Sequence, residues 1–253
     1  MTLATSVLLF LAAAVGGALN SVAGGGSFIT FPALLFAGVP AITANATSTV
    51  GLWPAGVASA FGYRRDLISA RGTLALMSGA SLVGGIVGAT LLLRTSESSF
   101  VHLVPLLLLG ATILFTLGPA VSARLRAQAG SARAPVAVAC VQVAIAIYGG
   151  YFGGGIGILM LASLSLLGMT HIHQMNALKT ILASFINGVA VVIFVARGAV
   201  LWAPAATMIV GGLGGGYLGA RVARRLDPRR VRGFVLVIAW AMTAWFFVRR
   251  FVI

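Results

Sequence analysis

Long apolar runs alternate with short polar segments along nearly the whole chain. The apolar runs fall at roughly 3–22, 27–38, 43–62, 72–93 and 100–120, and then at roughly 135–152, 156–168, 175–196, 199–220 and 231–248. A helix needs about 20 predominantly apolar residues to cross a bilayer. Most of the runs approach or reach that length, whereas 27–38 and 156–168 are too short for ordinary spans. The pattern predicts an all-α polytopic membrane protein in which these two runs are half-helices or re-entrant segments.

Three consecutive glycines interrupt the apolar sequence twice, at Gly24–Gly26 and at Gly153–Gly155. A glycine inside a helix costs about 1 kcal/mol relative to alanine, so each triplet predicts a break in a helix. Broken backbone at membrane depth is tolerated where it is buried in protein or lines a wet cavity. The helix that restarts would point its partly positive N-terminus into that cavity. Ser27 suits the N-cap of such a helix, whereas Ile156 does not.

The two glycine triplets belong to a longer internal recurrence. Gly24–Gly26 and Gly153–Gly155 are offset by 129 residues, and Asn45-Ala46 and Asn176-Ala177 are offset by 131. The same offset of 131 relates two further glycine pairs, Gly84 and Gly88 with Gly215 and Gly219. We interpret the series as two homologous repeats, 1–121 and 135–253, joined by an arginine-containing cytoplasmic linker, 122–134. Each repeat would hold about four helices, one of them discontinuous at its glycines.

Some of these glycines predict packing rather than chemistry. Gly84 and Gly88 lie one helical turn apart, as do Gly211, Gly215 and Gly219. Glycines at this spacing share one helix face and let two backbones approach closely in lipid. We therefore expect these residues at helix–helix contacts.

Charge is scarce, and nearly all of it is basic. The 253 residues include seventeen Lys plus Arg and three Asp plus Glu, for a net charge of +14. Mean hydropathy is +1.08. The arginines lie between apolar runs, so the positive-inside rule explains them better than a nucleic-acid partner does. The rule puts the arginine-rich loops 63–71, 122–134 and 221–232 in the cytoplasm.

The arginine-poor loops, 94–99 and the one around Arg197, are then expected outside. Arginine-rich and arginine-poor loops are exchanged between the two halves of the chain. This exchange favours inverted repeats, a common plan of secondary transporters. Both chain termini would lie outside the cell.

Lys179 is the most informative single residue. It is the only Lys, Arg, Asp or Glu between positions 134 and 196. A lysine at the middle of a membrane helix costs about 2.5–3.5 kcal/mol on insertion scales, so such a residue indicates function. The structural alternative is that its long stem carries the ammonium to the membrane surface.

Two polar stripes at helical spacing accompany this lysine. One holds Asn176, Lys179, Thr180, Ala183 and Asn187, and the other holds Asn45, Ser48, Thr49 and Gly56. Residues three and four apart share a helix face. Each hydroxyl alone is weak evidence, since Ser and Thr often bond to their own helix carbonyls. Together the stripes predict a shared polar site.

The three acids, Asp66, Glu97 and Asp227, lie at loop edges, so no carboxylate is available to pair with Lys179. An ammonium, glycine-break amides and half-helix N-termini together suit a small anion. His171 and His173 lack the further ligands that a metal site needs, so we expect neither metal nor cofactor. An enzyme would need acid, base or metal groups in a cleft, and the sequence supplies none.

The motifs resemble those of the sulfite exporter TauE/SafE family over nearly the whole chain. They are Leu19-Asn-Ser-Val-Ala-Gly-Gly-Gly-Ser-Phe, Asn45-Ala-Thr-Ser-Thr, Phe152-Gly-Gly-Gly-Ile-Gly and Asn176-Ala-Leu-Lys-Thr. The resemblance implies a tandem duplication of about eight helices in a bacterial inner (plasma) membrane protein that moves sulfite or an organosulfonate.

Motifs and resemblance together give a set of candidate substrate-binding residues. These are Gly24, Gly25, Gly26, Ser27, Asn45, Ser48, Thr49, Gly153, Gly154, Gly155, Asn176, Lys179, Thr180 and Asn187. The functional hypothesis is a secondary transporter, in the export direction, of small anions; an anion channel with the same central site is the alternative. The partners would be the anion and the lipid bilayer, and the sequence leaves open whether the chain forms a homo-oligomer.

Overall fold

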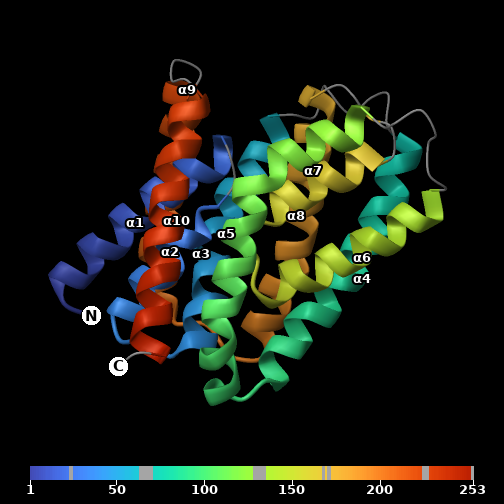
Figure 1. Ribbon diagram of the computed structural model, residues 1–253. Helices are drawn as coiled ribbons and strands as arrows, with labels where there is room; N and C mark the ends of the chain where they lie inside the picture. Colours follow the sequence, from blue (N-terminus) through green and yellow to red (C-terminus); the bar gives the residue numbers. More distant parts are fainter. Residues whose placement is uncertain are drawn as a thin grey trace.

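The computed structural model is a bundle of helices (Figure 1). It describes residues 1–22, 25–62, 71–127, 135–166, 169, 172–223 and 228–251. Those residues form α1 (Leu3–Val22), α2 (Ser27–Phe36), α3 (Ala41–Gly62), α4 (Arg71–Arg94), α5 (Glu97–Ala127), α6 (Pro135–Tyr151), α7 (Ile156–Leu166), α8 (Ile172–Ala196), α9 (Trp202–Ala223) and α10 (Pro228–Phe251). They include no strand. The all-α prediction is confirmed.

Several helices are suited to a membrane. In the described part of the chain, four are long and apolar enough to cross one, over Leu3–Asn20, Leu74–Arg94, Glu97–Gly118 and Ala177–Ala196. Large apolar side chains also face outward, with Val210 63% and Val237 70% exposed. Such exposure would be costly in water but suits contact with lipid tails. The chain is therefore a multi-pass membrane protein.

The two short helices each fold back on the helix before them. A Cβ built on Gly16 in α1 would lie 3.0 Å from the Thr30 methyl group in α2. In the other pair, the Ser163 hydroxyl of α7 donates to the side-chain carbonyl of Gln142 in α6, at 3.4 Å. In Figure 1 the α1–α2 hairpin opens toward the lower end, where both termini lie, and the α6–α7 hairpin opens toward the upper end.

Glycines let two pairs of helices pack backbone to backbone. A Cβ on Gly215 of α9 would lie 1.8 Å from the Ala14 carbonyl oxygen of α1. A Cβ on Gly88 of α4 would lie 2.1 Å from the Ile147 carbonyl oxygen of α6. Gly211 and Gly84 make similar approaches in the same two interfaces. The packing prediction from glycine spacing is confirmed for these four residues.

Two helix pairs meet at the centre of the bundle, α3 with α8 and α5 with α10. The Trp53 indole N–H of α3 donates to the Ser184 carbonyl of α8 at 3.0 Å. The Thr112 and Thr243 hydroxyls of α5 and α10 are hydrogen-bonded at 3.0 Å. In both pairs the partners are 131 residues apart. The crossing of α3 and α8 brings the two polar stripes together.

Candidate functional site

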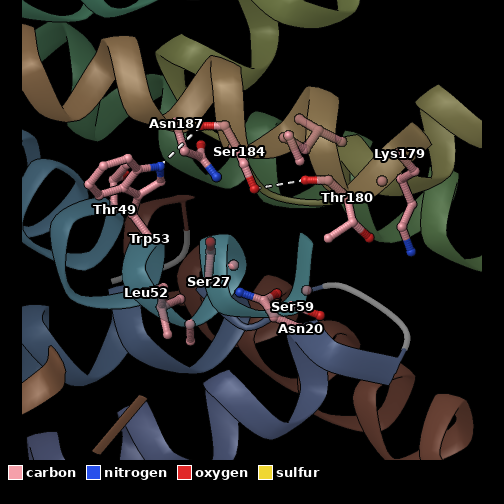
Figure 2. Close-up of a pocket in the computed structure, with 18 residues that line it drawn as sticks. Asn20, Ser27, Thr49, Leu52, Trp53, Ser59, Lys179, Thr180, Ser184 and Asn187 are labelled. Atoms are coloured by element: carbon pink, nitrogen blue, oxygen red, sulfur yellow. Dashed lines mark hydrogen bonds between the residues drawn. The ribbon is translucent and has the colours of Figure 1, made fainter. Parts of the chain in front are cut away.

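A polar cavity of about 100 Å³ lies where the two hairpins meet α3 and α8. Its described lining is Asn20, Gly25, Ser27, Thr49, Leu52, Trp53, Ala55, Gly56, Ser59, Gly153, Gly155, Ile156, Gly157, Lys179, Thr180, Ala183, Ser184 and Asn187. Figure 2 shows the α8 side chains across the cavity from Asn20 and Ser59. Both halves of the chain therefore contribute to one site.

The first glycine break brings the start of α2 to the cavity. Gly25 has a φ of +94°, which side-chain-bearing residues rarely adopt, and α2 begins at Ser27. Gly26 occupies the N-cap position and has no side-chain cap, so the expectation of a Ser27 cap is wrong. The Asn20 side-chain oxygen instead accepts the Gly26 N–H at 2.8 Å. This bond leaves the Ser27 hydroxyl in the cavity lining.

The second break is held by side chains from outside it. Gly153 and Gly155 have φ values of +79° and +75°. The Tyr148 hydroxyl donates to the Gly154 carbonyl at 2.8 Å, and the Asn45 amide donates to the Tyr151 carbonyl at 3.0 Å. These bonds satisfy carbonyls that would otherwise be orphaned at membrane depth. Helix α7 begins at Ile156, directly after this break.

Lys179 provides the cavity's charge. Its stem packs on α7, where a Cβ on Gly157 would lie 3.2 Å from the lysine Cδ. It is half-buried and is the only charged side chain in the described lining. Glu97, the acid that begins α5, accepts the Ala41 and Ile42 amides at the start of α3 and does not line the cavity. No described carboxylate competes with a ligand for the ammonium.

Several further hydrogen-bond donors face the cavity without a protein partner. The side chains of Ser27, Ser59, Asn187 and Lys179 form no hydrogen bond with the described residues. Among the residues that the structure describes, Asn20 bonds only through its side-chain oxygen, which leaves its NH₂ group available to a ligand. A buried donor without an acceptor costs about 1–3 kcal/mol, more if it is charged. The arrangement therefore calls for a ligand that accepts several hydrogen bonds and carries negative charge.

The candidate residues from the sequence divide into those that line the cavity and those that do not. The cavity is lined by Gly25, Ser27, Thr49, Gly153, Gly155, Lys179, Thr180 and Asn187. Gly26, Asn45, Ser48 and Gly154 are not in its lining. Gly24 lies outside the described residues, and the side chain of Asn176 is likewise not described.

Asn45 and Ser48 are displaced from the site by bonds to the two hairpins. The Asn45 amide is bonded to the end of α6, and the Ser48 hydroxyl to the Thr30 hydroxyl of α2 at 2.6 Å. Both side chains are buried, at 3% and 2% exposed. They fasten α3 to the hairpins, which is a structural role that helical spacing cannot distinguish from ligand binding.

The sequence analysis missed other lining residues. The main ones are Asn20, Trp53, Ser59, Gly157 and Ser184. Ser184 lies one turn after Thr180, and Trp53 one turn after Thr49, so extending each stripe by a turn would have found them. Asn20 belongs to the first of the quoted motifs but was not singled out, and no local signal identifies Ser59, which the length of α3 brings to the cavity. No cluster of three or more His, Cys, Asp or Glu that could hold a metal occurs in the described part of the chain.

Membrane-length helices around a cavity whose described lining holds one lysine define a multi-pass membrane protein. The chain belongs to the sulfite exporter TauE/SafE family, whose sequence profile matches residues 9–246. It is thus a membrane transporter of the TauE/SafE type.

Relatives of the chain bear transporter names. The chain is 30% identical over 243 residues to the "Probable membrane transporter protein ORF9" of Sinorhizobium sp, covering 92% of this chain and 89% of the relative. It is 29% identical to a "Probable membrane transporter protein" of Haemophilus influenzae, covering 94% and 92%. It is 26% identical to YfcA of Escherichia coli K12, also named a probable membrane transporter, covering 94% and 87%. No solved structure was found to match the chain.

Proposed function

We propose that this protein is a secondary transporter that exports a small anion, sulfite or an organosulfonate, across the bacterial inner membrane. The observation that carries the proposal is the Lys179 ammonium in a cavity whose described lining has several unpartnered donors and no carboxylate. An anion would satisfy both the charge and the donors. A membrane potential that is negative inside would favour its exit by about 2.3 kcal/mol per charge per 100 mV. The proposal includes no enzymatic step.

We also propose that residues 1–121 and 135–253 are inverted repeats joined by the linker 122–134. Exchanging α1–α5 with α6–α10 turns almost every packed helix pair into another packed pair. The bonded pairs Trp53–Ser184 and Thr112–Thr243 each join equivalent positions, as expected for contacts on a twofold axis. The two hairpins open at opposite ends of the bundle (Figure 1). These features support inversion.

The arginines support an orientation in the membrane. Twelve of the sixteen belong in sequence to the segments 63–71, 122–134 and 221–232. The helix ends that flank these segments lie at the upper end of Figure 1, away from the termini. By the positive-inside rule the upper end would be cytoplasmic. The α6–α7 hairpin would then enter from the cytoplasm and the α1–α2 hairpin from outside. Rocking of one repeat against the other would expose the site alternately.

The test of the proposed function is reconstitution of the purified chain into liposomes. Sulfite, thiosulfate, sulfoacetate and sulfate would be offered with and without an imposed potential. We expect saturable uptake of at least one anion, trans-stimulated by the same anion on the opposite side. A channel would instead give non-saturating flux and single-channel conductance. Absence of saturable flux for every anion would contradict the proposal.

A substitution at Asn20 tests whether the unpartnered donors of the cavity bind the anion. Replacing it with aspartate keeps an oxygen for the Gly26 N–H but converts the NH₂ donor into an acceptor with negative charge. We expect Asn20→Asp to raise the KM for the transported anion at least about tenfold, with little change in thermal stability. Asn45→Asp is the matched control, since its amide bonds to Tyr151 away from the cavity. That variant should lose stability more than affinity, and an unchanged KM in Asn20→Asp would remove Asn20 from the site.

A further inference from the structure

Two hydroxyl groups in the cavity lining have their protons committed to helix carbonyls. The Thr49 hydroxyl donates to the Asn45 carbonyl at 2.9 Å, and the Ser184 hydroxyl donates to the Thr180 carbonyl at 2.8 Å. A hydroxyl has one proton and two acceptor lone pairs. Each of these groups can therefore offer a ligand only lone pairs. A ligand with only acceptor atoms would have no proton to donate to these two hydroxyl oxygens, and their lone pairs would repel its own.

The two acceptors share one end of the cavity. Thr49 lies one turn before Trp53 on α3, and the Trp53 indole is bonded to the Ser184 carbonyl. Ser184 also faces α3, because a Cβ on Gly56 would lie 3.9 Å from its hydroxyl oxygen. Lys179 rests on Gly157, and Figure 2 shows it on the side opposite the indole. The cavity thus has a charged end at Lys179 and a neutral end, where the two hydroxyl acceptors lie near the Asn187 side chain.

The single positive charge in the described cavity lining can pair with one negative charge on a ligand. Lys179 is the only charged or readily titratable group in its described lining. The neighbouring phenols are held elsewhere, Tyr148 by the Gly154 carbonyl and Tyr151 with the Thr95 hydroxyl. A doubly charged ligand would bring one unpaired charge into a low-dielectric site, which is strongly unfavourable.

We propose that the cavity selects oxyanions that carry a single negative charge and one hydroxyl proton, and discriminates against their fully deprotonated forms. The charged oxygens would accept from Lys179, Asn20 and Ser27, and the hydroxyl would donate to Thr49 or Ser184. Within the proposed function, on which this inference rests, the selected species is hydrogen sulfite rather than sulfite dianion.

The experiment compares three anions in the reconstituted full chain across neutral pH. Sulfite changes between the singly and doubly charged forms in this range, sulfate stays doubly charged, and methanesulfonate stays singly charged without a hydroxyl. We expect the KM for total sulfite to fall as pH is lowered, in inverse proportion to the hydrogen sulfite fraction, after correction for entry into protein-free vesicles. Sulfate should compete poorly at every pH, and methanesulfonate should compete with a constant, weaker affinity. Deprotonation of Lys179 would instead lower the affinity for all three anions together.

Variants test the acceptors directly. Removing both acceptors, in the double variant Thr49→Val with Ser184→Ala, should raise the KM for sulfite about tenfold and leave competition by methanesulfonate within about twofold. The two single variants then show which hydroxyl accepts. Thr207→Val is the matched control, because Thr207 makes the same bond to a helix carbonyl, Ala203, at 3.0 Å on the exposed face of α9. It should change neither value.

Either of two outcomes with sulfite would overturn the inference: a sulfite KM that does not change with pH, or Thr49 and Ser184 variants that bind sulfite and methanesulfonate equally weakly. Strong competition by sulfate would do so as well. Each leaves the proposed function standing, since the wild-type protein would still transport an anion. Absence of saturable flux for every anion would instead defeat the proposed function itself.

Discussion

Replacing Lys179 with methionine is expected to reduce anion uptake at least about 100-fold without harming the folded protein. Methionine keeps an unbranched stem against Gly157 and removes the only charge in the described cavity lining. Loss of a charge-assisted contact in a desolvated site costs a factor of this size. Folding should not suffer, since a lysine at mid-membrane depth itself costs about 2.5–3.5 kcal/mol.

The measurement is initial uptake by reconstituted protein, beside the yield and elution profile in detergent. Lys179→Arg is the informative control, because it keeps the charge but replaces a compact ammonium with a longer planar group. We expect it to retain part of the activity. Wild-type flux in Lys179→Met with normal yield would show that the ammonium serves packing or membrane anchoring, and the anion site would have to be sought elsewhere.

Replacing Gly215 with alanine is expected to destabilise the protein severely, although only one methyl group is added. The new Cβ would lie 1.8 Å from the Ala14 carbonyl oxygen, and this neighbour is backbone that cannot rotate away. Helices α1 and α9 would have to separate along their shared interface. Overpacking usually costs about 1–3 kcal/mol, and a clash with backbone belongs at or above the top of that range.

The neighbouring Gly214 provides a matched control in the same helix. A Cβ there would meet nothing within 4 Å, so Gly214→Ala should be neutral or slightly stabilising. Thermal unfolding in detergent, followed by tryptophan fluorescence, would compare the two variants. Equal melting temperatures would contradict the close approach of α1 and α9.

Much of the fold could be predicted from the sequence, because membrane helices can be recognised as long apolar runs. The apolar runs predicted the observed helices to within a few residues at most ends, and the short helices begin at Ser27 and Ile156, directly after the glycine triplets. Hydrocarbon forces every backbone group in a span to bond within its own helix, so local sequence and structure are tightly coupled. The extension of α5 to Ala127 was not predicted, since its last turns are polar.

The site was only partly predictable. Lys179, Thr49 and Asn187 stood out because polar residues are rare in these helices, and all three line the cavity. Asn45 and Ser48 had the same signal, yet their side chains bond to the hairpins. Periodicity identifies a helix face, but it cannot say whether that face meets a cavity or another helix.

The sequence by itself determined that the chain is helical and membrane-embedded, where two short helices begin, and that one lysine stands alone among apolar residues. These properties depend on transfer free energy and backbone bonding, which act within a single segment. Only the tertiary structure decided which side chains share the cavity, that Asn20 joins them, and that Thr49 and Ser184 direct their protons away from it. Those facts depend on how α3, α8 and the two hairpins cross, and the crossing is set by contacts between residues more than a hundred positions apart.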